Sequence, residues 1–249
     1  MIDVSLQGDV AILTMVHGKA NALSTEFCDS LAARVREASA ASAIVITAKG
    51  RIFSAGVDLP FLLAGGPAYV REFLPALHRL YDTVFFHPKP IVAAVNGHAI
   101  AGGCVLACAA DRRLMAASSG RVGVTELLVG VPFPPLAFEI MRYATAPQLF
   151  PSAIFSGATF EPPEAIGRGF IDEIVPPDEL LQRAVTAAET LAALSPPAFA
   201  VTKRQLRQPV AERTAANEAA FGPVVVDTWA APQAQSRIRD YVTRTFKTS

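Results

Sequence analysis

The chain has 249 residues, 51% of them hydrophobic, which is enough to bury one large core. Its 22 basic and 22 acidic residues balance to a formal net charge of zero, which gives no electrostatic reason to bind nucleic acid or a membrane surface. The sequence shows neither a run of about 18 uncharged apolar residues nor a basic stretch leading into an apolar one, so no membrane span and no secretory signal are predicted. We therefore expect a soluble, cytoplasmic enzyme.

The N-terminal part of the chain predicts a hairpin followed by a helix. Apolar segments at 4–6 and 10–16 flank Gln7-Gly8-Asp9, a pattern typical of two antiparallel strands joined by a turn. A helix is then expected to begin at Ser24 or Thr25. Its apolar positions fall four apart and form one buried stripe, made by Phe27, Leu31 and Val35.

An internal repeat dominates the middle of the chain. The segment 44–59, IVITAKGRIFSAGVDL, recurs in outline 47 positions later as 91–106, IVAAVNGHAIAGGCVL. Each copy predicts a buried strand, a turn and a tight glycine loop, and such repeats are typical of stacked supersecondary units. Two such loops lying side by side would direct backbone N–H groups at one point, as an oxyanion site requires. The alternative is that the glycines only permit tight turns.

The remaining elements divide the chain into two regions. An apolar helical pattern at 69–81 predicts a helix bent at Pro75, preceded by a mobile lip at Gly65-Gly66. A further strand is expected at Arg112–Ala116. From Pro196 onward strand patterns vanish, and helices are expected at 198–207, 211–229 and 233–246. We predict an α/β core domain over 1–195 and a C-terminal helical oligomerisation region over 196–249.

Four groups of residues together resemble the crotonase (enoyl-CoA hydratase/isomerase) superfamily. They are Asn21-Ala22-Leu23, Phe53 to Leu59, Asn96-Gly97 with Ala101-Gly102-Gly103-Cys104, and Glu126 with Gly130 and Pro132. The resemblance implies a spiral of ββα repeats with a C-terminal helical trimerisation region, and a homotrimer or dimer of trimers. It also implies an acyl-CoA thioester as substrate, coenzyme A being part of that substrate, with no metal and no separate cofactor.

The resemblance assigns catalytic roles to three positions. The backbone N–H groups of Val57 and Gly102 would hold the thioester oxygen, and Glu126 would be the acid or base. Hydratases of the family use two glutamates, and Val105 stands where the first would be, so a Δ3,Δ2-enoyl-CoA isomerase with one glutamate is favoured. Glu126 would then move a proton from C2 to C4 through a dienolate. As a plain structural residue, Glu126 would begin a helix or form a salt bridge.

A second set of positions is expected to bind the coenzyme part of the substrate. The set consists of Lys19, Ala55, Asp58, Leu59, Trp229 and Lys247. Within it, Asp58 is also a candidate helix cap, and Lys19 could equally be a surface lysine. Trp229 and Lys247 would reach the adenine and phosphate of a neighbouring subunit's ligand, although a tryptophan is more often core or interface. Lys203, Arg204 and Arg207 are expected to form a solvated helix face, with CoA phosphates as the alternative ligand of this cluster.

Other functions stay open at this point. One is an enoyl-CoA hydratase or a β-dicarbonyl acyl hydrolase with a second acid or base from elsewhere in the pocket. Another is a CoA-binding member with little turnover, whereas the zero net charge argues against RNA binding. Three cysteines, Cys28, Cys104 and Cys108, lack metal-type spacing and predict buried thiols. A nucleophilic dyad of His98 and Cys104 is disfavoured.

Overall fold

Three successive ββα units form the centre of the molecule. The computed structural model describes residues 1–118 and 120–246. The units are β3 (Ala43–Ala48), β4 (Ile52–Ser54) and α2 (Leu59–Phe85); β5 (Ile91–Val95), β6 (His98–Ile100) and α3 (Gly102–Cys108); and β7 (Arg112–Ala116), β8 (Val122–Gly123) and α4 (Glu126–Val129). This arrangement confirms the predicted spiral of ββα repeats.

Two sheets collect the strands of these units. The larger sheet has the order β1-β2-β3-β5-β7-β10, and its last strand, β10, spans Glu173–Val175. The strands β1 (Ile2–Gln7) and β2 (Val10–Met15) form the predicted antiparallel hairpin, and all other neighbouring pairs in this sheet are parallel. The smaller sheet has the order β4-β6-β8-β9, with β9 at Thr159–Phe160. In the larger sheet Ile44 lies opposite Ile91, so the two copies of the repeat are paired in register.

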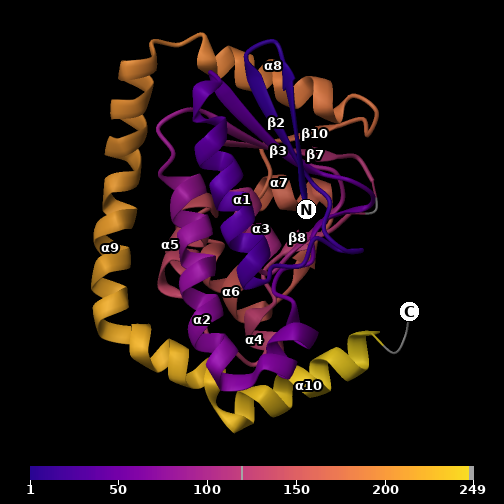
Figure 1. The fold of residues 1–249 in the computed structure, drawn as a ribbon, viewed down its shortest axis with the longest axis vertical. Helices are drawn as coiled ribbons and strands as arrows, with labels where there is room; N and C mark the ends of the chain where they lie inside the picture. The colour runs from indigo at the N-terminus through magenta and orange to yellow at the C-terminus, as the bar shows by residue number, and fades with distance from the viewer. Residues whose placement is uncertain (119, 247–249) are drawn as a thin grey trace.

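Helices cover both faces of the larger sheet, which is why β3 and β5 are buried at every position and apolar at all of them except Thr47. One face packs against α8 (Leu180–Ala192), and the other packs against α1 (Thr25–Glu37) and α2, as Figure 1 shows. The α1 helix begins where the sequence predicts, with the Ser24 hydroxyl accepting a hydrogen bond from the N–H of Phe27. Shorter helices complete the core: α5 (Pro135–Ala144), α6 (Phe150–Ser156) and α7 (Pro162–Arg168).

The C-terminal part differs from the prediction in its helix count. Instead of three helices it forms α9 (Pro196–Ala230), which continues through Pro209, and α10 (Pro232–Phe246). In Figure 1, α9 runs along the outside of α2 and α5, and α10 crosses the end of the molecule against α2 and α4. Likewise α2 departs from helical geometry at Gly66, with φ +60°, and not at Pro75. The division at residue 195 stays a prediction.

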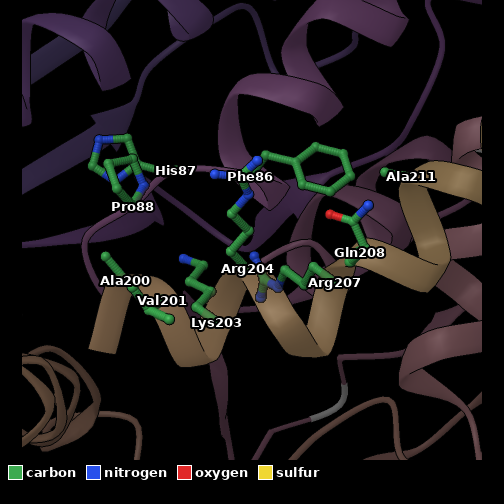
Figure 2. Close-up of a pocket in the computed structure, with 10 residues that line it drawn as sticks. All are labelled: Phe86, His87, Pro88, Ala200, Val201, Lys203, Arg204, Arg207, Gln208 and Ala211. Atoms are coloured by element: carbon green, nitrogen blue, oxygen red, sulfur yellow. The ribbon is translucent and has the colours of Figure 1, made fainter. Parts of the chain in front are cut away.

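A buried ion cluster attaches α9 to the core and corrects the expected solvated face for Lys203 and Arg207, whereas Arg204 is exposed as predicted. Lys203 and Arg207 are buried and donate to the two carboxylate oxygens of Asp111 at 2.7 and 2.8 Å. Figure 2 shows both cations on α9, at a cavity of about 470 Å³ that also borders Phe86 and His87. Burial lowers the pKa of Lys203 to about 8 although Asp111 partly offsets the effect. Their partner, Asp111, lies between α3 and β7, so the periodicity of α9 could not reveal it.

The described helices were also compared with what a membrane span requires. No single one of them is long and apolar enough to cross a membrane. Only α8 and α9 taken together meet that requirement by length and composition, across a bend of 100°.

Candidate active site

The first glycine loop holds its backbone in a conformation that leaves one N–H unused. The N–H of Gly56 donates to the Ser54 hydroxyl at 3.2 Å, and the Gly56 carbonyl accepts from the N–H of Leu23 at 2.8 Å. The next donor along, the N–H of Asp58, bonds the Leu23 carbonyl at 3.0 Å. Val57 therefore lies opposite Leu23 with its own N–H directed away from it. This geometry requires φ +80° at Gly56, which glycine adopts without steric cost.

The second loop exposes a matching donor at the start of α3. Ala101 has φ +50° and ψ −124°, backbone angles that a residue with a side chain adopts only under strain. Its carbonyl accepts from the N–H groups of Cys104 and Val105, and Tyr81 donates to the Gly102 carbonyl at 2.9 Å. Gly102 is the first residue of α3, so its N–H has no acceptor within the helix. Strain of this kind is concentrated at functional sites.

The two loops touch each other at their glycines. A Cβ atom added to Gly56 would lie 2.7 Å from the Ile100 carbonyl oxygen and 3.0 Å from the Gly102 nitrogen. A Cβ on Gly103 would likewise collide with the Ser54 carbonyl. Within the described part of the chain, the N–H groups of Val57 and Gly102 donate to no other residue. Two unused amides side by side can stabilise one oxyanion.

A cavity of about 440 Å³ opens in front of these loops. Both loops contribute to its lining, and Glu126 also borders it. The rest of the lining is largely apolar and comes from distant parts of the chain, including Ala20, Ala22, Ile100, Val129, Val131 and Trp229. A cavity of this kind, with few polar groups, is typical of a small-molecule site.

Glu126 is the buried acid of this cavity. It begins α4 shortly after β8, the residue is 7% exposed, and its Oε2 has no hydrogen-bond partner among the described residues. Burial raises the pKa of Glu126 from 4.5 to about 7, an effect that backbone hydrogen bonds at the start of α4 partly offset. A carboxyl group with this pKa can both accept and donate a proton near neutral pH.

Nearly the whole chain matches the model of one family. A model of the enoyl-CoA hydratase/isomerase family covers residues 6–244. The chain belongs to this family. It is 37% identical over 168 residues to a Thermus thermophilus protein named as an enoyl-CoA hydratase, an alignment that covers 66% of this chain and 65% of that protein. Enoyl-CoA delta isomerase 1 from rat mitochondria is 27% identical over 217 residues, which is 85% of this chain and 75% of the rat protein.

The fold agrees with that of enoyl-CoA hydratase/isomerase family structures. The crystal structure of human mitochondrial Δ3,Δ2-enoyl-CoA isomerase matches with a TM-score of 0.94 over 100% of this chain and 99% of the human chain. The sequence identity is 24%, so this likeness establishes the shared crotonase fold. The resemblance inferred from the sequence motifs is therefore confirmed for both family and fold.

The residues expected to bind the coenzyme differ in their placement. Ala55, Asp58 and Leu59 line the cavity, and the Asp58 side chain also caps α2 by accepting from the N–H of Phe61 at 3.0 Å. Lys19 is exposed, next to Ala20, which lines the cavity. Lys247 lies outside the described residues.

Trp229 is buried within this chain. It is 2% exposed, lines the cavity and donates its indole N–H to the Pro132 carbonyl at 2.8 Å. This position favours a role inside the subunit's own cavity over contact with a neighbouring subunit's adenine.

Three further positions bear on the chemistry that this member of the enoyl-CoA hydratase/isomerase family can carry out. Val105 is fully buried in the core, at the position where the resemblance predicts the first glutamate of a hydratase. His98 accepts at Nδ1 from the N–H of Arg121, and a hydrogen bond to Cys108, together with burial, raises the pKa of the Cys104 thiol. A raised thiol pKa disfavours the thiolate, which supports the prediction against a nucleophilic dyad.

The sequence reading missed several residues of the site. Tyr81 is the last residue of the apolar helical pattern at 69–81, and a buried tyrosine needs a partner for its hydroxyl, which is the signal that could identify it. Tyr241 and Thr245 of α10 border the cavity. No local motif marks them, because their position depends on how α10 packs against α2 and α4.

Proposed function

We propose that this protein is a Δ3,Δ2-enoyl-CoA isomerase. The observation that carries the proposal is one buried carboxyl group, Glu126, bordering the same cavity as two glycine loops with unused amides. The names of the rat and human relatives, both enoyl-CoA isomerases, support the same reaction. Such a reaction needs no metal and no redox cofactor, because it only moves a proton within the substrate.

In the proposed mechanism the thioester oxygen accepts hydrogen bonds from the N–H groups of Val57 and Gly102. The Glu126 carboxylate removes a proton from C2 of the 3-enoyl thioester, and the released electron pair spreads over a dienolate whose oxygen the two amides stabilise. The protonated Glu126 then returns the proton to C4. The double bond now lies between C2 and C3, and Glu126 is again a carboxylate. A pKa of about 7 serves both steps.

An enoyl-CoA hydratase is the second candidate, and two observations favour it. The Thermus thermophilus relative is named as a hydratase. In addition, Asp58 places another carboxyl group at the cavity. Against this role, Asp58 Oδ1 already accepts the N–H of Phe61 as the cap of α2. A β-dicarbonyl acyl hydrolase would also require a second acid or base.

The test compares two variants, in each of which one carboxyl group at the cavity is replaced by its amide. Glu126→Gln should lower the rate of 3-hexenoyl-CoA isomerisation, followed by conjugated thioester absorbance, by about 10²-fold or more, because the proton carrier is lost. Asp58→Asn should keep most of the activity, since asparagine also caps helices well. Equal rates for wild type and Glu126→Gln would refute the mechanism. Efficient conversion of 2-enoyl-CoA to 3-hydroxyacyl-CoA, lost in both variants, would establish the hydratase.

A binding role without catalysis is tested in the same preparation. Thermal stabilisation by acetyl-CoA, in the absence of turnover on any enoyl thioester, would indicate a CoA-binding member of the family.

The assembly proposed is a homotrimer or dimer of trimers, with the cytoplasm as its compartment. Exposed apolar side chains at the C-terminal helices support association, among them Leu194, Val201 and Leu206. The three cysteines are free and buried, which is consistent with a reducing compartment. Light scattering on the purified protein measures the subunit number directly, and a monomeric mass would refute the proposed assembly.

A further inference from the structure

Trp229 connects the lining of the catalytic cavity with that of a second cavity. It lines the catalytic cavity together with Val129 and Val131. Its indole N–H donates to the carbonyl of Pro132, a residue that lines the second cavity of about 530 Å³. In three pairs of consecutive residues, one member lines the catalytic cavity and the other lines the second cavity: Glu126 and Leu127, Val131 and Pro132, and Trp229 and Thr228. The two cavities are therefore adjacent, with the same short segments of the chain contributing to both.

The catalytic cavity has a lining of two kinds. Ala20 borders it next in the chain to the exposed Lys19, where a charged nucleotide part of the ligand can remain in water. Val129, Val131 and the buried Trp229 contribute apolar side chains to it, and the indole N–H is already bonded to Pro132. An acyl chain extending from a thioester held at Val57 is drawn toward these apolar side chains, because burying methylene groups is favourable.

We propose that Trp229 sets the acyl chain length that the enzyme accepts, by closing the catalytic cavity against the second one. The inference rests on the proposed binding of acyl-CoA thioesters. It implies that short acyl groups fit in front of the indole, and that longer chains are excluded until the indole is removed. The second cavity is lined largely by apolar side chains, including Phe133, Phe138, Ile154 and Val225, so it can hold the additional methylene groups.

The experiment measures binding of saturated acyl-CoA thioesters by calorimetry, from butanoyl- through octanoyl- to hexadecanoyl-CoA. Saturated thioesters cannot isomerise, so the result does not depend on turnover. In wild type, affinity should stop rising at a short chain length. In Trp229→Ala and the milder Trp229→Leu it should continue to rise, by up to roughly fourfold per added methylene group. A folded variant that keeps the wild-type limit overturns the proposal.

Two further variants keep the test decisive if truncation of Trp229 prevents folding. Val131→Phe narrows the cavity in front of the indole and should move the limit to shorter chains, and an unchanged limit would refute the inference. Phe133→Leu is the matched control, because Phe133 lines only the second cavity, and it should keep the wild-type limit. If wild type binds no acyl-CoA of any length, the proposed function itself fails, whereas binding with no length limit overturns only the role of Trp229.

Discussion

The Tyr81 hydroxyl donates a 2.9 Å hydrogen bond to the carbonyl of Gly102, the residue whose N–H is one of the two proposed oxyanion donors. Burial raises the pKa of Tyr81, so the hydroxyl stays protonated and able to donate. Tyr81 is not part of the cavity lining, and its effect on the reaction would pass through the backbone that it holds. It is therefore a positioning residue of the second loop.

Tyr81→Phe should lower kcat for isomerisation by roughly tenfold with little change in KM, because the amide loses its fixed direction while the ligand contacts remain. The free energy of unfolding should fall by about 1–2 kcal/mol. Steady-state kinetics and urea denaturation measure the two effects. Tyr69→Phe is the control, since it also removes a tyrosine hydroxyl that is hydrogen-bonded, here by the N–H of Thr25. Equal losses of kcat in both variants would show that the effect is not specific to Gly102.

Gly56→Ala should abolish most catalysis because the new methyl group would push the two loops apart. Its Cβ would lie 2.7 Å from the Ile100 carbonyl oxygen. We expect kcat/KM to fall about 10²-fold or more, the loss typical of a missing oxyanion donor. Gly50→Ala provides the comparison, because Gly50 also has positive φ, at +88°, but has no atom within 4 Å of an added Cβ. A similar loss of kcat/KM in both would mean that backbone strain alone explains the result.

The pH dependence of the rate should report the titration of Glu126. The carboxylate is the form that removes the C2 proton, so kcat/KM should rise with pH and level off above about 7, the raised pKa of Glu126. Stopped assays with 3-enoyl-CoA across this range give the profile. A midpoint near 4.5 instead would indicate a carboxyl group in contact with water.

Stability should show the opposite trend with pH. Between 4.5 and about 7 the folded chain keeps a proton on Glu126 that the unfolded chain has already released. The free energy of unfolding should therefore fall as pH rises through this range, by up to about 1.4 kcal/mol per pH unit. Urea denaturation of wild type and Glu126→Gln at several pH values isolates this contribution by subtraction. Parallel curves for the two proteins would contradict a raised pKa.

The ion cluster on α9 should contribute strongly to stability. Asp111→Asn removes the negative charge between the buried Lys203 and Arg207 while keeping an acceptor for the N–H of Ile91. Loss of one partner in such a site typically costs about 3–5 kcal/mol. Asp29→Asn is the matched control, because its ion pair with Arg79 is about half exposed and should contribute less than about 1 kcal/mol. Chemical denaturation measures the free energy of unfolding of both variants. Equal losses of this free energy would contradict the cluster's role in stability.

The sequence predicted those parts of the fold whose signals are local or repeated. The hairpin, the Ser24 cap and the strand at Arg112–Ala116 follow from short patterns, and the repeat located both glycine loops before their contact was known. The prediction failed where residues distant in the sequence determine the local structure. Pro209 lies within an unbroken α9 because packing overrides its tendency to end a helix. Lys203 is buried because Asp111, 92 positions earlier, compensates its charge.

The same limit applies to the site. Val57, Gly102 and Glu126 were located by motif, whereas Tyr81 and Tyr241 were not, since their relation to the cavity depends on how whole helices pack. The failure at Pro75 has a similar cause. A proline bend was expected there, but α2 changes direction at Gly66, where glycine can adopt φ +60°.

The ladder between β3 and β5 holds Ile44 and Ile91 opposite each other, so the chain between them leaves and re-enters the sheet at fixed points. That excursion includes the first turn of α2, where Leu59 and Pro60 border the cavity, and the break at Gly66. Closing a loop becomes only slowly more costly as it lengthens, so insertions near the break can leave the ladder intact. A longer excursion can therefore alter the part of the cavity that Leu59 and Pro60 border while the pairing of β3 with β5 is kept.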